Sequence, residues 1–287
     1  MMSNEIVGIL HPGDMGIFVA ASAKNSGNEV HWVSEERSEN SRHRAEKYGL
    51  TDTGSLVELC KTCSIIISVC PPHAAEDVAQ QVLVQGFNGL YVDANAISPQ
   101  KVKSIAERMG AGGVDFVDGG IVGGPVWEGG RTWLYLSGGQ AERVATCFTD
   151  GPLATYVLGG GVGKASALKM CYAAYTKGTT ALLCSILATA EKNGVREELE
   201  AQWSRDWDGF AEQAQNRTRR VTAKAWRFTG EMDEISETFS EAGLPGDFHA
   251  GAAEVYRRLA GFKDAESTPE LSGVLEALLQ EPASVNK

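Results

Sequence analysis

The stretch Val7-Gly8-Ile9-Leu10-His11-Pro12-Gly13-Asp14-Met15-Gly16 decides the fold. It joins an apolar, strand-like segment to an alanine-rich segment with helical character. Glycines in a GxGxxG pattern at such a turn allow a tight bend and a close approach of the backbone to a pyrophosphate. Gly13 and Gly16 fit the second and third glycines, whereas His11 occupies the first position. The pattern alone also fits a structural turn. Its place before the first helix favours a dinucleotide site, because a helix N-terminus attracts anions.

Strand-like and helix-like segments alternate from this turn to about residue 160. Ser64–Val69 is the clearest strand, because β-branched residues pack well on a pleated sheet, and its continuous apolarity indicates burial on both faces. The other expected strands are Glu5–Leu10, Glu29–Ser34, Leu90–Asp93, Asp115–Val117, Trp133–Ser137 and Thr155–Leu158, and the expected helices include Met15–Asn25, Ser38–Tyr48 and Pro99–Met109. This alternation predicts an α/β protein with a Rossmann-type, doubly wound parallel sheet.

The C-terminal part of the chain has no convincing strand pattern. We therefore expect residues 1–163 to form the dinucleotide-binding Rossmann domain and residues 164–287 to form an all-helical domain for substrate binding and dimerisation. Ala165–Glu191 is a single apolar helical pattern of roughly 40 Å at the α-helical rise. A small helical domain cannot cover such a helix alone, so we expect a homodimer. Further helices are expected at Glu197–Ala214, Arg220–Ala242, Phe248–Leu259 and Pro269–Leu279.

The composition excludes several classes of partner and site. A net charge of -11 argues against nucleic acid and anionic membranes as partners. No apolar run reaches the ~20 residues that span a bilayer, and the first residues lack a signal-peptide pattern, so a cytoplasmic protein is expected. The six cysteines show no disulfide pattern. Cys60-Lys-Thr-Cys63 lacks the second pair of a zinc site and is interpreted as structural, and the histidines have no metal-binding spacing.

The end of the second expected strand selects between the two nicotinamide cofactors. In Ser34-Glu35-Glu36-Arg37-Ser38, an acid would bond the ribose 2′-OH of NAD, whereas an arginine would bind the 2′-phosphate of NADP. Arg37 and Ser38, followed by Arg42 and Arg44, make a cationic corner that favours NADP, with NAD still possible. The alternative is that Arg42 and Arg44 belong to a solvated helix face.

Four more segments carry motifs: Cys70-Pro71-Pro72, Asp93-Ala-Asn95-Ala96-Ile-Ser98, Asp118-Gly-Gly-Ile-Val122-Gly123-Gly124 and Gly163-Lys-Ala-Ser-Ala-Leu-Lys169. With the first turn, they resemble the β-hydroxyacid dehydrogenases over nearly the whole chain. That group contains 6-phosphogluconate and 3-hydroxyisobutyrate dehydrogenases and tartronate semialdehyde reductases. The resemblance and the corner after the second strand imply these cofactor-binding residues: His11, Pro12, Gly13, Asp14, Met15, Gly16, Ser34, Arg37, Ser38, Cys70, Pro71, Pro72, Asn95 and Ala96. The resemblance also implies substrate-binding residues, which are Val122, Gly123 and Gly124, and a catalytic lysine, Lys169.

A less characterised branch of that group, with a phosphogluconate-dehydrogenase-like C-terminal domain, is the closer resemblance. It carries an LHPG-x-MG first turn, an R-S pair after the second strand and a W-R-F-x-x-E-M stretch, which Trp226–Met232 matches. Two departures from the larger group concern the substrate. Val122 replaces a serine that binds the substrate carboxylate, and Tyr172 and Ala173 replace two asparagines. The polar groups that usually orient a hydroxy acid are therefore partly absent.

Reduction of a carbonyl builds negative charge on its oxygen, where a donor is needed. Lys169 lies in an apolar stretch of the long helix, where burial would favour proton exchange near neutral pH; a structural ion pair is the alternative. Tyr172 shares its helix face and either assists or packs. Lys177 and Arg227 are candidates for an anionic substrate end. The alternatives are a solvent-facing Lys177 and a pair between Arg227 and Glu231, one turn apart.

The sequence thus predicts an NAD(P)-dependent oxidoreductase, with NADP favoured. It would transfer a hydride between nicotinamide and a small hydroxy acid or its aldehyde or ketone. An imine reductase on the same fold is the enzymatic alternative. Lys169 favours carbonyl chemistry, because many imine reductases replace the lysine of the larger group. A non-catalytic NADP-binding protein is the alternative from another class.

Overall fold

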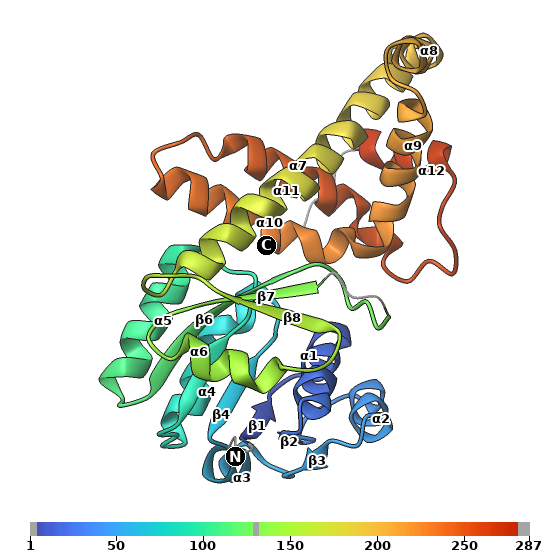
Figure 1. Cartoon of the computed structure of the whole chain (residues 1–287). Helices are drawn as coiled ribbons and strands as arrows, with labels where there is room; N and C mark the ends of the chain where they lie inside the picture. The colour runs from blue at the N-terminus through green and yellow to red at the C-terminus, as the bar shows by residue number, and fades with distance from the viewer. Residues whose placement is uncertain (1–4, 129–131, 281–287) are drawn as a thin grey trace. The chain divides into compact units, whose positions relative to one another are not determined.

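The computed structural model describes residues 5–128 and 132–280 of the chain. Contacts divide the chain into two compact units, Met1–Met170 and Cys171–Lys287 (Figure 1). The boundary falls within one long helix, α7 (Lys164–Lys192), whose first residues belong to the first unit.

The first unit is built on an eight-stranded sheet with the strand order β3-β2-β1-β4-β5-β6-β7-β8 (Figure 1). Its strands are β1 (Ile6–Ile9), β2 (Glu29–Trp32), β3 (Thr51–Asp52), β4 (Ile65–Ser68), β5 (Leu90–Asp93), β6 (Asp115–Val122), β7 (Thr132–Ser137) and β8 (Leu153–Val157). Neighbouring strands are parallel except for β6 and β7, which are antiparallel. The predicted Rossmann-type α/β fold is confirmed.

Helices cover both faces of this sheet. They are α1 (Asp14–Asn25), α2 (Glu39–Lys47), α3 (Leu56–Thr62), α4 (Ala75–Val84), α5 (Pro99–Ala111) and the short α6 (Ala141–Ala145). Consecutive side chains of β4 enter two different cores: Ile65 and Ile67 pack with residues of α1, whereas Ile66 packs with residues of α3, α4 and α5. This alternation explains the continuous apolarity of β4, because a strand buried on both faces needs apolar residues at every position.

Helices are the regular elements of the second unit among its described residues. After α7 it contains α8 (Arg196–Asp206), α9 (Phe210–Val221), α10 (Ala225–Glu241), α11 (Asp247–Leu259) and α12 (Leu271–Leu279). The expected single helix Glu197–Ala214 is therefore wrong, since the chain turns at Gly209 with a positive φ of 69°. Among the described residues, no helix is long and apolar enough to cross a membrane.

Candidate cofactor and active site

The loops expected to bind the cofactor lie at the carboxyl-terminal end of the parallel strands. They follow the carboxyl ends of β1, β2, β4 and β5, which run parallel to one another. The chain crosses from one side of β1 to the other between β3 and β4, so β1 and β4 flank a topological switch point. Open α/β sheets bind ligands in the crevice at such a point.

The first turn is shaped by its glycines. The amide of Gly13 donates to the carbonyl of His11 at 2.9 Å, and a Cβ at Gly16 would lie 1.9 Å from that same carbonyl oxygen. Because that distance is far shorter than a van der Waals contact, only glycine fits at position 16. A Cβ at Gly13 would meet nothing within 4 Å, and no side chain caps the first turn of α1. The uncapped N–H groups of α1 suit an anion such as a pyrophosphate.

Two arginines of α2 hold the neighbouring loops. Arg44 donates from Nε to the carbonyl of Pro12 at 2.9 Å and lies 3.6 Å from the Asp14 carboxylate. Arg42 donates to the carbonyl of Ser34 at 2.7 Å. These two hydrogen bonds tie α2 to the loops after β1 and β2.

Ser34 and Ser38 have structural partners in the second loop. The Ser34 amide donates to Asp52 Oδ1 at 3.1 Å, and the Gly54 amide donates to the same oxygen at 2.8 Å. Burial raises the pKa of the Asp52 carboxyl, but the hydrogen bonds from Ser34 and Gly54 outweigh it and hold the pKa below its ordinary value. The Ser38 hydroxyl caps α2 by accepting from the Ser41 amide at 3.3 Å. Asp52 was not expected as a supporting residue, because its two-residue strand has no sequence pattern.

A cavity of about 300 Å³ opens beside the first two loops, with His11 and Arg37 in its wall. Its other lining residues are Leu10, Val33, Glu35, Glu36, Leu56, Val57, Val78, Gln81, Val82 and Gln85. Burial and the charge of Arg37 lower the pKa of His11 to about 4, and burial also lowers the pKa of Arg37. Glu36 adopts a left-handed φ of 56° in the turn that closes from the Arg37 amide to the Ser34 carbonyl. A strained non-glycine turn thus precedes Arg37.

Asn95 ties the loops after β4 and β5 together. Its Oδ1 accepts from the Cys70 amide at 2.6 Å, and its Nδ2 donates to the Ser68 hydroxyl at 3.2 Å. Burial raises the pKa of the Cys70 thiol to about 12, so this cysteine stays protonated at neutral pH. Pro71 and Pro72 follow and open a short helical turn, while Ala96 is buried.

The beginning of α7 is fixed to β6 by the buried carboxylate of Asp118. Its Oδ2 accepts from the amides of Gly163, Ala165 and Ser166 at 2.9 to 3.1 Å, and its Oδ1 accepts from the Ser166 hydroxyl at 2.6 Å. A carboxylate at a helix N-terminus satisfies amides that have no partner within the helix and interacts favourably with the helix dipole.

Lys169 is held in place by this arrangement. Its Nζ donates to the carbonyl of Ile121 at 2.9 Å. A Cβ at Gly120 would lie 2.5 Å from the Ala165 carbonyl oxygen and 3.3 Å from the Lys169 Cβ, so glycine permits the close approach of β6 and α7. The three expected substrate residues follow directly, with Val122 ending β6 and Gly123 and Gly124 after it. Asp118 and Gly120 support the site in ways that motif matching had not indicated.

The second unit contains the other expected residues. Lys177 forms an ion pair with Glu231, and both side chains are largely buried, with 17% and 11% exposed. The Phe228 ring lies 4.6 Å from Lys177 Nζ. The solvent-facing alternative for Lys177 is therefore wrong, and Glu231 of α10 pairs with Lys177 of α7. Arg227 is exposed and lies over the Trp226 ring.

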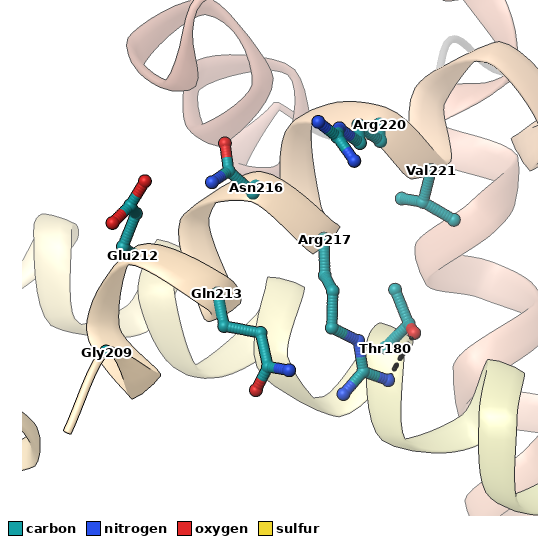
Figure 2. A pocket seen from close by; sticks show the side chains of 8 residues that line it. All are labelled: Thr180, Gly209, Glu212, Gln213, Asn216, Arg217, Arg220 and Val221. Carbon is teal, nitrogen blue, oxygen red and sulfur yellow. Dashed lines mark hydrogen bonds between the residues drawn. The ribbon is translucent and has the colours of Figure 1, made fainter. Parts of the chain in front are cut away.

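A larger cavity of about 570 Å³ lies between α7 and α9 of the second unit. Figure 2 shows Arg217 of α9 reaching toward Thr180 of α7, to which it donates at 2.6 Å. The remaining lining residues are Gly209, Glu212, Gln213, Asn216, Arg220 and Val221. None of the expected site residues lies in this wall, so size alone does not identify the site.

Cys60 and Cys63 are buried, and burial raises the pKa of their thiols to about 11 and about 12. Such thiols are poor nucleophiles and metal ligands, which supports the structural interpretation. In the described part of the chain, no group of three or more His, Cys, Asp or Glu side chains is placed to hold a metal ion.

Family profiles match both parts of the chain. Residues 6–149, half of the chain, match the NAD binding domain of 6-phosphogluconate dehydrogenase. Residues 190–259 match a domain of unknown function designated DUF1932. The first match confirms that the first unit is an NAD(P)-binding domain.

Two curated relatives share part of their sequence with the chain. An uncharacterised 28.5 kDa protein of Methanothermus fervidus is 30% identical over 171 residues, which are 60% of this chain and 65% of that protein. The mitochondrial 3-hydroxyisobutyrate dehydrogenase of Drosophila melanogaster is 26% identical over 140 residues, which are 47% of this chain and 43% of that protein. The chain thus spans less than two thirds of either relative.

Solved structures extend the likeness to nearly the whole fold. A conserved protein of unknown function, described as similar to 3-hydroxyacid dehydrogenases, is 28% identical, with a TM-score of 0.67 over 89% of this chain and 97% of that chain. Mycobacterium tuberculosis 3-hydroxyisobutyrate dehydrogenase, solved with L-serine, has a TM-score of 0.68 at 16% identity over 97% of this chain and 100% of that chain. An imine reductase variant from Myxococcus stipitatus, solved with NAD+, has a TM-score of 0.56 at 17% identity over 97% of this chain and 100% of that chain. The chain belongs to the family that carries the NAD binding domain of 6-phosphogluconate dehydrogenase, with the fold of the 3-hydroxyacid dehydrogenases and a C-terminal domain of unknown function.

Proposed function

We propose that the protein is an NADP(H)-dependent oxidoreductase that acts on a small hydroxy acid or its aldehyde or ketone. The observation that carries this proposal is the position of Lys169. It stands where the sequence resembles the catalytic segment of the β-hydroxyacid dehydrogenases, and its ammonium group donates to the Ile121 carbonyl just before Val122, Gly123 and Gly124. The likeness to hydroxyacid dehydrogenases in sequence and fold supports the same activity.

Lys169 has the chemistry that carbonyl reduction needs. The bound nicotinamide would supply the hydride, and the ammonium group would donate a hydrogen bond and then a proton to the carbonyl oxygen as negative charge develops there. In the oxidative direction, the neutral amine would accept the hydroxyl proton. Tyr172, three residues further along α7 and 51% exposed, is the proposed assisting donor. Asp118 and Gly120 are positioning residues, because they act through the start of α7.

The proposed preference for NADP rests on Arg37 and Ser38. Arg37 is a desolvated cation in the wall of the cavity beside the first two loops, and Ser38 follows it at the start of α2. A guanidinium group suits a phosphate because it offers several donors in one plane. Glu35 and Glu36 line the same cavity and are the residues that would favour NAD instead.

Two departures from the resembled group bear on the class of substrate. Val122 and Ala173 present no hydroxyl or amide where the resembled group carries serine and asparagine. The proposed site is accordingly more apolar than that of a simple 3-hydroxy acid dehydrogenase. Arg227, which is exposed on α10, is the proposed binder of a substrate carboxylate or phosphate. Lys177 has a weaker claim, since Glu231 neutralises it.

An imine reductase is the second candidate, and the same apolar surroundings favour it, because an imine needs no carboxylate-binding serine. Oxidation of NADPH against a panel of aldehydes, keto acids and cyclic imines separates the candidates. We expect turnover with aldehydes or keto acids. Turnover of cyclic imines alone would support the second candidate, and NADPH binding without turnover on any member of the panel would support a non-catalytic protein.

The cofactor preference is tested separately by binding. We expect NADPH to bind more tightly than NADH, and Arg37→Ala to weaken NADPH binding by roughly tenfold, because a charge-assisted pair with the phosphate is lost. NADH binding should change little. Tighter binding of NADH to the unaltered protein would mean that Glu35 or Glu36 bonds the ribose instead.

A further inference from the structure

Two polar atoms in the wall of the first unit's cavity have unmet bonding capacity. His11 Nδ1 and Arg37 Nε are both buried, and neither has a hydrogen-bond partner among the described residues. They come from the loops after β1 and β2, which are adjacent parallel strands paired at Ile9 and Trp32. Buried polar atoms are rarely left without partners, so such a pair indicates a ligand group that is bound there in the working protein.

The cavity suits the adenosine end of a dinucleotide. Leu10, Val33, Val78 and Val82 give it apolar walls on which a base can lie, and the amides of Gln81 and Gln85 are available to the base edge. His11 and Arg37 supply the polar side of the same space. In Rossmann folds, a residue after the second strand reaches the ribose 2′ position. Arg37 follows β2, and His11 lines the same cavity as Arg37.

The charged residues in the cavity wall are of both signs, namely Arg37, Glu35 and Glu36. The charge of Arg37 acts on the imidazole of His11 and opposes a positive charge there. Glu35 and Glu36 are exposed residues of the turn that carries Arg37, Cys70 approaches Arg37 from the loop after β4, and Asp14 is paired with Arg44. The cavity-lining residues contributed by α3 and α4 are uncharged. In the free protein the imidazole is therefore neutral, since burial and Arg37 both oppose a second positive charge.

We propose that His11 and Arg37 clamp the 2′-phosphate of NADP(H), and that His11 takes up one proton from solvent when this phosphate binds. The inference rests on the proposed NADP preference. It adds His11 as a second phosphate-binding residue and the uptake of one proton on binding. The bound phosphate dianion neutralises Arg37 and the newly formed imidazolium, and each cation donates to a phosphate oxygen. The only bond that forms is the new N–H bond of the imidazolium, and the balance is protein plus phosphate plus one proton from solvent giving the protonated complex.

Calorimetric titration with the fragments 2′,5′-ADP and 5′-AMP tests the proposal. The titrations are run near pH 7.5 in two buffers that differ in ionisation enthalpy, so that the number of protons exchanged is measured. At that pH a phosphate monoester, with a second pKa of about 6, is a dianion, and a nearby cation can only make it release protons. Net uptake therefore identifies a protein group. We expect uptake of roughly half to one proton with 2′,5′-ADP and none with 5′-AMP.

Matched variants assign the proton. His11→Asn keeps a polar side chain but cannot be protonated, and it should abolish the uptake and weaken 2′,5′-ADP about tenfold while leaving 5′-AMP within about twofold. His11→Gly restores the glycine of the GxGxxG pattern and serves if the asparagine perturbs the turn. His43→Asn is the control, because His43 is exposed on α2 close to the same loops in sequence. It should leave uptake unchanged.

The outcomes separate this inference from the proposed function. Equal binding of 2′,5′-ADP and 5′-AMP to the unaltered protein would overturn the NADP preference and the clamp together. Tighter binding of 2′,5′-ADP without proton uptake, or with uptake that persists in both His11 variants, would leave the NADP preference standing and overturn the role of His11.

Discussion

At the scale of single residues, Lys169 is positioned by atoms far from it in the chain. Asp118 caps the start of α7, and the Ile121 carbonyl accepts from the ammonium group, so the side chain is fixed before any substrate arrives. Preorganised donors are effective in catalysis because they need not reorganise as charge develops. An altered residue at 169 should therefore affect the chemical step more than binding.

Lys169→Ala should lower kcat by roughly 10²-fold or more, the usual scale for removing a positioned acid. The dissociation constant of NADPH should barely change, because the lysine would contact substrate. Steady-state kinetics with the best substrate from the panel, together with fluorescence titration of NADPH, measure the two effects. Lys164→Ala is the control, since Lys164 is an exposed lysine of the same helix. Near-normal turnover of Lys169→Ala would contradict the assignment, and Tyr172 would then be the donor to test.

His11 should make stability depend on pH in a definite direction. Its pKa is lowered to about 4 by burial and by Arg37, whereas an unfolded histidine titrates at about 6.5. Above pH ~6.5 the imidazole is neutral in both states. As the pH falls toward ~4, the unfolded chain takes up a proton that the folded protein refuses, so the folded protein loses up to ~3 kcal/mol.

Urea unfolding of the protein and of His11→Asn at about pH 7.5 and about pH 5 measures this loss. The variant should lose less stability between the two values, and His43→Asn should behave as the unaltered protein does. An equal loss in all three proteins would mean that other groups govern acid stability.

Individual residues differ in how far the sequence reveals them. Gly16 was predictable because its contact with the His11 carbonyl lies within one loop. Lys169 was named from the family resemblance, and its role stays a prediction. Asp118 and Asp52 were not predictable, because each acts through amides that lie in other segments, such as Gly163 for Asp118. Long-range hydrogen bonds leave no periodic pattern in a sequence.

At the scale of elements, the close approach of β6 and α7 depends on Gly120. Gly120→Ala should destabilise the protein by about 1–3 kcal/mol, because the added Cβ would lie 2.5 Å from the Ala165 carbonyl and the backbone must shift. The shift should also displace Lys169 and lower kcat. Urea unfolding and steady-state kinetics measure the two effects. Gly139→Ala is the control, since a Cβ there meets nothing within 4 Å. Normal stability and kcat in Gly120→Ala would show that the contact relaxes without cost.

Most elements were predicted correctly, because burial imposes a period on their side chains. The strand Leu90–Asp93 was predicted with its bounds, and β4 within one residue at each end. The errors have physical causes. β3, at Thr51–Asp52, is too short for a pattern, and β6 continues through Gly119 and Gly120, which weaken any strand signal. The break at Gly209 was missed, because the helical pattern resumes after it.

At the scale of the whole molecule, the two units differ in how much of their fold the sequence pattern predicts. The first unit follows from alternating strands and helices with two buried faces. The second follows from helical periodicity alone, which predicts that helices exist but not how they pack. The pair between Lys177 and Glu231 belongs to that packing, so the sequence offered Arg227 as the partner of Glu231 instead.

One side of α7 carries several exposed apolar and aromatic side chains. Tyr172, Tyr175 and Leu182 of α7 are 51%, 72% and 45% exposed. Their spacings of three and seven residues place them along one side of the helix, as in a helix–helix seam. We propose that a second copy of the chain covers this stripe, because removing such apolar surface from water is favourable. The protein should then behave as a homodimer in light scattering at micromolar concentration.

Charged substitutions test the stripe directly. Tyr175→Glu combined with Leu182→Glu should shift the measured mass to about half, since each carboxylate would be desolvated at the seam. Trp207→Glu is the control, because Trp207 is a 57% exposed apolar residue outside α7. If the mass falls equally in the control, the stripe is not specific to assembly. If the unaltered protein is a monomer, the dimer is wrong, and the exposed face of α7 needs another explanation.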